Sequence, residues 1–395
     1  MNIAMLGTGF IGRFYTDALV GNRSKDRVVS VYSRTEEKGK RFADDYDVPF
    51  YTTSMEEAIQ QENVEVVCIS LPNHLHEEAV MLCVKHSKAV ICTKPLGRNS
   101  DEAFRMMKAV EEAGIFNGYL EDLVYTPKFL KSWEVVRNGG IGRVLWAKSR
   151  ETHPGPHSDW FWDKEMAGGG AILDLGCHCI EIARTFIGKD ILPVEVMCWA
   201  DTQVKPIDAE DHAIGLVKYE NGAIGQFEVS WTFRGGLDLR DEVMGEEGTI
   251  WSNGFMRTGL EIFTTGKSGG YVAEKAESDS GWLFPVGDEL NDLGYNHMFR
   301  DMFEALESDD QPRETFYDGY IVNAVMDAAY KSASSKKWEP VELKEWRGLT
   351  GLSKDSHLTD YDDEYYLIKE EHTHYGDKKV ILKHKETGKI VEKTI

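Results

Sequence analysis

The first part of the chain alternates short apolar runs with segments of helical spacing. The apolar runs that predict strands lie at 3–6, 28–32, 64–71 and 88–92. The segments that predict amphipathic helices lie at 13–20, 36–46, 54–60, 75–84 and 100–113. Continuous apolar strands that alternate with helices are typical of a parallel sheet covered on both faces. We therefore expect an α/β domain over residues 1–124.

After about residue 125 the pattern changes to strands in succession, several of them with a period of two. These predicted strands lie at 142–151, 192–200, 212–219, 223–232 and 248–251. Asn221-Gly222 joins two of them as a tight hairpin. Two later helices are predicted at 289–307 and 319–332, and we expect the second to return to the first domain. Residues 125–342 are thus predicted to form an α+β domain with a large open antiparallel sheet.

Residues 343–395 are additional to this two-domain plan. Segments 378–383 and 388–394 predict a hairpin that turns at Glu386-Thr387-Gly388. An isolated hairpin is marginally stable, so we expect it to dock on a sheet, such as that of a neighbouring subunit.

A glycine-rich sequence joins the first predicted strand to the first predicted helix. It reads Gly7-Thr8-Gly9-Phe10-Ile11-Gly12 and has the strand–turn–helix context of a dinucleotide-binding Rossmann fingerprint. Gly7 would permit the tight turn, Gly9 the approach of backbone to a pyrophosphate, and Gly12 the packing of helix on strand. The alternative is a purely structural turn.

Ligands of such sheets bind beyond the carboxyl ends of the strands, so the segments that follow the strands should surround one crevice. The predicted cofactor-binding residues are Gly7, Thr8, Gly9, Phe10, Ile11, Gly12, Ser33, Arg34, Leu71, Pro72, Asn73, His76, Thr93, Lys94, Pro95 and Glu121. After the second strand the chain has Ser33-Arg34 and no acid until Glu36. An arginine there can pair with the 2′-phosphate of NADP, which favours NADP over NAD. If Arg34 only stacks on adenine, either form of NAD(P) would fit.

A possible proton-transfer pair lies in the middle of the chain. Three glycines, 168–170, precede a helical pattern that contains Asp174 and His178. Residues four apart share one face of an α-helix, so Asp174 is predicted to orient His178 and to raise its basicity. A purely structural hydrogen bond is the alternative.

Together, the fingerprint, the Lys-Pro after the fourth strand and the glycine run before D-x-x-x-H resemble the Gfo/Idh/MocA family of oxidoreductases. The likeness covers about residues 1 to 340. It implies a Rossmann domain, an open-faced sheet domain, and a homodimer or homotetramer formed through that sheet.

The resemblance also implies roles for individual residues. Lys94 matches the lysine of the family's Glu-Lys-Pro motif, Asp174 and His178 match its aspartate and histidine, and Asn73 and His76 match the loop beside the nicotinamide. Thr93 stands where the family usually has glutamate, and Glu121 is a candidate to replace that charge.

The expected reaction is hydride transfer between NAD(P) and a secondary hydroxyl of a sugar, sugar derivative or cyclitol. The nicotinamide would exchange the hydride, His178 would act as the base, and Lys94 would stabilise the developing alkoxide. Aromatic and polar groups suit a polyhydroxylated ring. The candidate substrate-binding residues are Arg150, His153, His157, Trp160 and Asp163.

Two other functions remain open at this stage. A tightly bound NAD(H) could oxidise a sugar transiently and permit elimination, as in a redox-assisted glycosidase or lyase. A non-catalytic nucleotide sensor is the other alternative. Accumulation of reduced cofactor distinguishes the dehydrogenase from the lyase.

Composition restricts the partners. The formal net charge of −22 opposes binding to the nucleic-acid backbone and to anionic membranes. The sequence shows neither a predicted membrane span nor a signal peptide, so we expect a cytoplasmic protein with reduced cysteines. Cys177-His178-Cys179 suggests zinc, but adjacent helical residues point in different directions, so no metal site is expected.

Overall fold

The computed structural model describes residues 1–255, 259–352 and 359–395. They form two compact units, Met1–Gly351 and Leu352–Ile395. The predicted division at residues 124/125 falls inside the first unit, and residues 343–351, predicted to belong to the extension, are also part of it.

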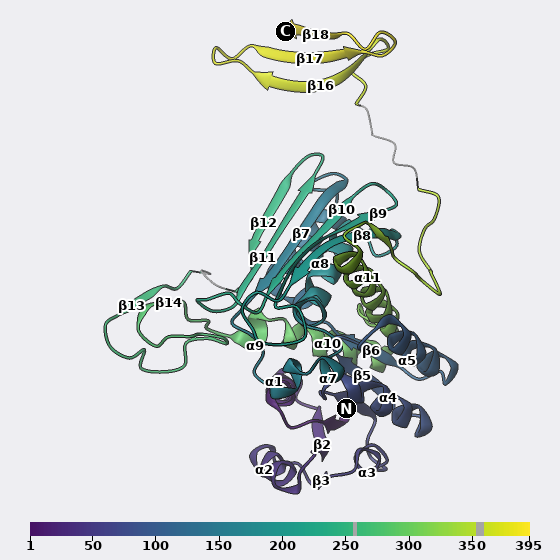
Figure 1. The fold of residues 1–395 in the computed structure, drawn as a ribbon, viewed down its shortest axis with the longest axis vertical. Helices are drawn as coiled ribbons and strands as arrows, with labels where there is room; N and C mark the ends of the chain where they lie inside the picture. Colours follow the sequence, from purple (N-terminus) through teal and green to yellow (C-terminus); the bar gives the residue numbers. More distant parts are fainter. Residues whose placement is uncertain (256–258, 353–358) are drawn as a thin grey trace. The chain divides into compact units, whose positions relative to one another are not determined.

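The amino-terminal part of the first unit is a six-stranded parallel sheet in the order β3-β2-β1-β4-β5-β6. In Figure 1 it lies below the second sheet of the same unit. Its strands are β1 (Asn2–Leu6), β2 (Arg27–Tyr32), β3 (Phe50–Thr52), β4 (Val66–Ile69), β5 (Ala89–Thr93) and β6 (Asn117–Leu120). Its helices are α1 (Phe10–Asn22), α2 (Glu36–Tyr46), α3 (Met55–Ile59), α4 (His76–Lys85) and α5 (Ser100–Glu112). The predicted Rossmann domain is confirmed. The sequence pattern missed β3 and β6, which are three and four residues long.

The second sheet has seven strands in the order β12-β11-β7-β10-β9-β8-β15. They are β7 (Val144–Thr152), β8 (Pro193–Asp201), β9 (His212–Tyr219), β10 (Ile224–Ser230), β11 (Asp238–Gly245), β12 (Thr249–Asn253) and β15 (Glu339–Pro340). The predicted open sheet is present, but it is mixed, because β7 and β10 run parallel. The prediction lacked β11, which pairs with β7 on the side away from β10.

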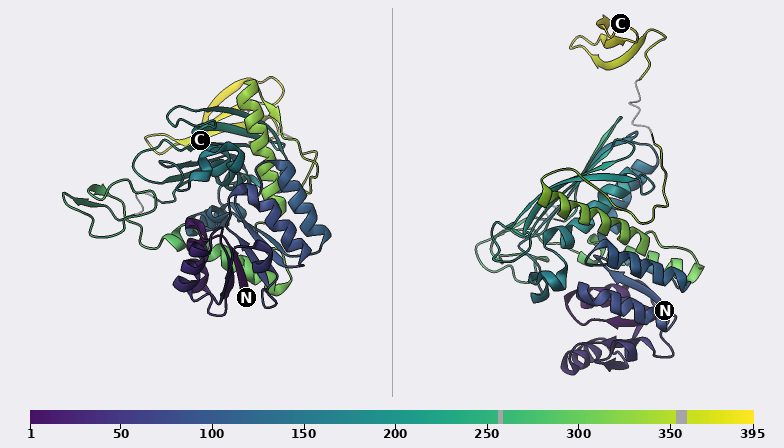
Figure 2. Two further views of the ribbon diagram at one scale, coloured as in Figure 1. Left: turned by 60° about the horizontal axis from the view of Figure 1, so that its bottom comes forward. Right: turned by 45° about the vertical axis from the view of Figure 1, so that its right-hand side comes forward.

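Helices cover one face of this sheet. Helix α8 (Cys177–Ile187) packs on β7 and β10, and α11 (Phe316–Ser335) packs on both β8 and α5. The predicted return of the late helix to the first domain is therefore correct, and Figure 2 shows α11 in green beside the blue α5. Asn323 of α11 exchanges hydrogen bonds with the backbone of Gly97.

The predicted helix at 289–307 is interrupted. It forms α9 (Glu289–Asp292) and α10 (Tyr295–Ser308), separated at Gly294, which has a φ of +86°. An added Cβ there would lie 2.3 Å from the carbonyl oxygen of Asp122, so the close approach requires glycine. Helix α10 packs against α1.

The remaining elements of the first unit are short or lie at its edges. They are α6 (Pro127–Arg137), α7 (Lys164–Ala167), the 3₁₀ turns at Asn73–Leu75, Asp122–Tyr125 and Asp159–Trp162, a π-helical segment at Ile172–Gly176, β13 (Ile262–Thr264) and β14 (Gly281–Leu283).

The second unit is a three-stranded antiparallel sheet of β16 (Tyr365–His372), β17 (Lys378–His384) and β18 (Ile390–Thr394). The predicted hairpin corresponds to β17 and β18, and β16 is an additional strand. Its docking on another sheet stays a prediction.

Among the described residues, one helical stretch, Lys164–Ile187, is long and apolar enough to cross a membrane by length and composition, although no span is predicted from the sequence. In the structure 89% of the window is buried. Its apolar side chains are therefore already covered by the protein's own core.

Candidate active site

A cavity of about 1010 Å³ lies between the two sheets of the first unit. One wall is formed by the segments that follow β1, β2, β4 and β5, and the other by β7, α7 and the π-helical segment. The predicted crevice at the carboxyl ends of the parallel strands therefore exists.

The glycine-rich turn forms one end of the cavity. Gly7 has a φ of +115°, and an added Cβ would lie 2.4 Å from the Ser70 carbonyl oxygen. Gly9 begins α1 without a side-chain cap, and nothing lies within 4 Å of the place where its Cβ would be. Uncapped N–H groups beside open space fit a dinucleotide pyrophosphate. Gly12 does not line the cavity. Its missing Cβ lets α1 approach the carbonyl oxygen of Gly7, which is the packing role predicted for it.

Cations surround the end of β2. Arg34 lines the cavity with Lys38 and Arg41 of α2, and Ser33 is bonded to Thr8 at 2.9 Å. No acidic side chain from this stretch lines the cavity among the described residues. The arrangement fits a ribose that carries a 2′-phosphate.

Lys94 and Asp174 form a largely buried ion pair in the cavity wall. The Lys94 ammonium donates to the Asp174 backbone carbonyl at 2.7 Å and to Oδ1 at 3.0 Å, while the Trp231 indole donates to Oδ2 at 3.0 Å. Burial opposes ionisation of Asp174, but Lys94 outweighs it, and the pKa of the carboxyl falls to about 2. Burial also opposes the charge on Lys94, yet Asp174 holds its pKa well above the usual range. Both groups are charged at neutral pH.

The glycine run places Asp174 here. An added Cβ at Gly169 would lie 2.0 Å from the Tyr330 hydroxyl oxygen, and one at Gly170 would lie 2.0 Å from the Glu210 carbonyl oxygen. The Glu210 carboxylate accepts hydrogen bonds from the N–H groups of Gly170 and Ile172. These contacts anchor the start of the π-helical segment that carries Asp174.

The predicted orientation of His178 by Asp174 is wrong. Asp174 lies in the π-helical segment, whose wider turn removes the face-sharing that an α-helix gives residues four apart. The Asp174 carboxylate bonds to Lys94 and Trp231 instead.

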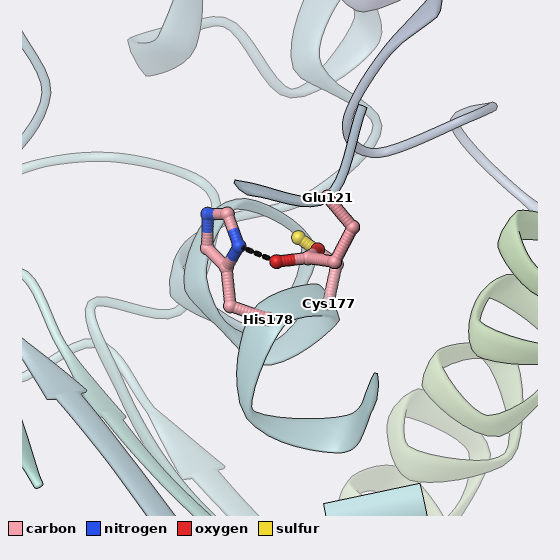
Figure 3. Close-up of side chains that lie close together, drawn as sticks. All are labelled: Glu121, Cys177 and His178. Carbon is pink, nitrogen blue, oxygen red and sulfur yellow. Dashed lines mark hydrogen bonds and ion pairs between the residues drawn. The ribbon is translucent and has the colours of Figure 1, made fainter. Parts of the chain in front are cut away.

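His178 bonds to a different carboxyl group. Its Nδ1 is hydrogen-bonded to Oε1 of Glu121, which follows β6, as Figure 3 shows. Burial lowers the pKa of His178 to about 3 and raises that of Glu121 to about 8. His178 lines the cavity and Glu121 does not, so the carboxyl group lies behind the imidazole.

Thr93 has no direct ionic role. Its hydroxyl shares a 2.8 Å hydrogen bond with the buried Tyr15 hydroxyl. Glu121, the candidate to replace the charge of the usual glutamate, is hydrogen-bonded to His178, and Lys94 is close enough to lower the pKa of its carboxyl group.

Several lining groups were missed by sequence reasoning. Glu151 of β7 and Asp122 are buried beside the cavity. Burial raises the pKa of Asp122 to about 7 and holds the pKa of Glu151 well above its usual range. Lys275 donates to the Gly155 carbonyl at 3.1 Å, and burial lowers its pKa. The alternation along β7 could have indicated Glu151. We find no sequence signal for Lys275.

Most predicted residues line the cavity. Those from the first domain are Gly7, Thr8, Gly9, Phe10, Ile11, Ser33, Arg34, Leu71, Pro72, Asn73, Thr93 and Lys94. Those from the second are His153, His157, Trp160, Asp163, Asp174 and His178. Gly12, His76, Pro95, Glu121 and Arg150 do not line it.

Some of the lining residues also have local partners. Asn73 donates to the Ala167 carbonyl at 2.7 Å. His153 accepts from the N–H of Gly155 at 2.9 Å, and burial lowers its pKa to about 3. Asp163 caps α7 by accepting from the N–H groups of Glu165 and Met166. These contacts hold in place the loops that surround the cavity.

Two placements are corrected. His76 is fully buried, and its ring is bonded to the carbonyls of Leu71, Pro95 and Leu96, so it ties two cavity loops together from behind. Arg150 forms ion pairs with Glu228 and Asp238. It alternates with Glu151 along β7, and therefore faces away from the cavity.

Within the described residues, two groups of side chains lie close enough together to hold a metal ion. In the first, one atom each of Glu121, Cys177 and His178 lie within 4.8 Å of one another, but the Lys94 ammonium is close enough to act on the pKa of all three. A nearby fixed cation disfavours a second one. The second group is Glu181, Glu314 and Asp318, whose charges are already matched by Arg184 and Lys189.

Comparisons with known proteins agree with this architecture. Residues 1–118 match the model of an oxidoreductase family with an NAD-binding Rossmann fold, and residues 129–251 match that of the GFO/IDH/MocA C-terminal domain. Levoglucosan dehydrogenase of Pseudarthrobacter phenanthrenivorans is 24% identical, over 86% of this chain and 98% of its own. Myo-inositol 2-dehydrogenase of Thermotoga maritima is 26% identical, over 87% and 99%.

Solved structures share the fold. GenD2 from gentamicin A biosynthesis, in complex with NAD, superposes with a TM-score of 0.82 at 29% identity, over 87% of this chain and 97% of its own. Levoglucosan dehydrogenase with NADH and levoglucosan superposes with a TM-score of 0.75 at 24% identity, over 87% of this chain and all of its own.

Proposed function

Because the chain belongs to the Gfo/Idh/MocA family of oxidoreductases, we propose that it transfers a hydride between a nicotinamide cofactor and a secondary hydroxyl of a sugar, sugar derivative or cyclitol. The observation that carries the proposal is that Lys94 and His178 line the same cavity as the glycine-rich turn. Relatives named for levoglucosan and myo-inositol support the substrate class.

The dinucleotide would be held by the turn at residues 7–12 and by the residues after β2 and β4. When bound, the nicotinamide supplies the hydride acceptor or donor. The protein supplies position, a fixed positive charge and a proton acceptor.

Lys94 is the fixed positive charge. Its ammonium uses two hydrogen bonds on Asp174 and has a third N–H available for a substrate oxygen. A cation beside the reacting hydroxyl stabilises the negative charge that develops on oxygen as the proton leaves. Asp174 holds that cation in place.

His178 is the proton acceptor at the substrate hydroxyl. Burial keeps the imidazole neutral at physiological pH, as a general base requires. Its Nδ1 is occupied by Glu121, so Nε2 is the nitrogen that can bond to the substrate.

The outer part of the cavity suits a polyhydroxylated ring. Trp160 stacks on Phe161 with ring centroids 3.7 Å apart, and His157 lies against Phe10. Aromatic faces match the C–H face of a sugar, while His153 and Lys275 offer polar contacts to its hydroxyls.

NADP is the preferred cofactor in this proposal. Arg34, Lys38 and Arg41 provide three positive charges where the 2′-phosphate would lie. The relatives solved with NAD or NADH make the alternative testable.

We also propose a homo-oligomer that forms through the outer face of the seven-stranded sheet. This face carries exposed Trp199, Ile214, Met244 and Trp251, on the side away from α8. Large exposed apolar side chains gathered on one face are typical of an interface.

The proposal is tested by measuring the absorbance of reduced nicotinamide over a panel of sugars, glycosides and cyclitols, each with NAD and with NADP. We expect steady accumulation of reduced cofactor with at least one of them. Release of an aglycone without that accumulation would support the redox-assisted lyase, and cofactor binding without any turnover would support a sensor.

A further inference from the structure

We propose that Glu121 is the proton store of His178, so that the carboxyl and the imidazole accept the substrate proton as one unit. This inference rests on the proposed function and assigns a positioning and proton-holding role to a residue that does not touch the substrate.

The geometry places the two groups in series. Glu121 is fully buried behind His178, and its Oε1 is bonded to Nδ1 (Figure 3). Its other oxygen, Oε2, is buried and has no hydrogen-bond partner in the described part of the chain. His178 lines the cavity and Glu121 does not, so the imidazole lies between this carboxyl group and the cavity.

The surroundings disfavour a charged imidazolium. His178 is only 4% exposed, and burial and the Lys94 cation both lower its pKa. A histidine that took up a proton and kept it would be a second cation beside Lys94 in a low-dielectric site. The proton therefore needs another place to go.

Glu121 provides that place. Burial raises the pKa of its carboxyl group to about 8, against the opposing influence of Lys94. Near neutral pH the carboxyl can gain or lose a proton at little free-energy cost, which is the condition for acid–base catalysis. A neutral imidazole bonded to either form of the carboxyl completes the pair.

The proton step then balances as follows for alcohol oxidation. The substrate O–H bond breaks as a bond from its proton to Nε2 forms, while the Nδ1–H bond breaks and an O–H bond forms on Glu121. The imidazole stays neutral, the carboxylate becomes a carboxylic acid, and the C–H electron pair leaves as the hydride assigned above. Reduction runs the same proton path in reverse.

Other titratable groups face the pair, and their titration must be distinguished from that of Glu121. Among the described residues they are Lys94, Tyr119, Asp122, Glu151, Asp174, Cys177, Cys179, Glu181 and Lys189. Of these, Asp122 has a raised pKa of about 7, so a bulk pH profile alone would not assign the titration.

The sign of the pH dependence follows from the protonation state that each direction requires. Oxidation needs the carboxylate form of Glu121, so the rate of oxidation should rise with pH through about 8. Reduction needs the carboxylic acid, so the rate of reduction should fall over the same interval. In Glu121→Gln the amide cannot store the proton, so the rates of oxidation and reduction should both fall by about 100-fold. Their pH profiles should also lose the midpoint near 8. Cys177→Ser changes a neighbouring buried side chain but not the carboxyl–imidazole bond, and should keep the midpoint.

The test that does not depend on turnover is infrared difference spectroscopy of the full chain labelled with ¹³C in its glutamate side chains. We expect an isotope-shifted band of a protonated carboxylic acid that disappears with a midpoint near pH 8 and is missing in Glu121→Gln, while Asp122→Asn and Glu151→Gln retain it. Persistence of the band in Glu121→Gln, or its absence from the wild type, would overturn the proton store. If the band behaves as expected but no sugar or cyclitol is oxidised, the proposed function fails and the proton store stands.

Discussion

The Lys94 ammonium, at the end of β5, donates to both the backbone carbonyl and the side chain of Asp174, eighty positions later in the chain. The two residues come from the two halves of the first unit. Their contact holds a cation at the cavity wall and links the two halves across the proposed active site.

This pair yields a prediction about stability. Asp174→Asn removes the negative charge and leaves the Lys94 ammonium buried with a neutral partner, which should reduce the free energy of unfolding by about 3 kcal/mol. In the double variant Lys94→Met/Asp174→Asn the unpaired charge is gone, so part of the loss should be recovered. Urea denaturation of the wild type, of Asp174→Asn, of Lys94→Met and of the double variant measures the coupling free energy between the two side chains. Equal losses in the single and double variants would contradict a paired buried charge.

The glycine-rich turn gives a matched pair of variants. Gly9→Ala adds a methyl group to open space, so the free energy of unfolding should change by about 0.5 kcal/mol or less. The same methyl group enters the space assigned to the pyrophosphate and should weaken NAD(P) binding by about tenfold or more.

Gly7→Ala should behave differently. The residue has a positive φ and an added Cβ would collide with Ser70, so the fold itself should lose about 2 kcal/mol or more. Thermal unfolding and cofactor titration together separate the two effects. Unchanged cofactor affinity in Gly9→Ala would place the dinucleotide elsewhere.

Cofactor choice is predicted to depend on Arg34. Arg34→Ala removes a charge-assisted contact with the 2′-phosphate and should raise the KM for NADP by about tenfold, with little change for NAD. Lys40→Ala is the control, since Lys40 is an exposed cation of the adjacent helix, α2, that does not line the cavity. A parallel change for both cofactors would indicate that Arg34 stacks on adenine instead.

The sequence predicted the repeating parts of the fold well, because apolar periodicity and the glycine fingerprint report local structure. Helix α2 and strand β9 have the predicted bounds. Strands β3 and β6 were missed because three or four residues are too few to show a period.

The site was predictable where a residue follows a strand and unpredictable where partners meet through tertiary structure. Asp174 and His178 were paired on the assumption of an α-helix, and the π-helical segment separates their roles. Glu121 and Trp231, which bond to them, lie 57 residues away in the sequence in each case. Arg150 was selected for its chemistry, but strand alternation turns it to the opposite face from Glu151.

The central claim is that His178 accepts the substrate proton, and the most direct measurement is the turnover of His178→Ala with the best substrate and saturating cofactor. We expect a fall in kcat of about 10²-fold or more with cofactor affinity retained. We expect no comparable fall in His86→Ala, which alters a histidine that caps the C-terminal end of α4 and does not line the cavity. Turnover of His178→Ala at the wild-type rate would contradict the account.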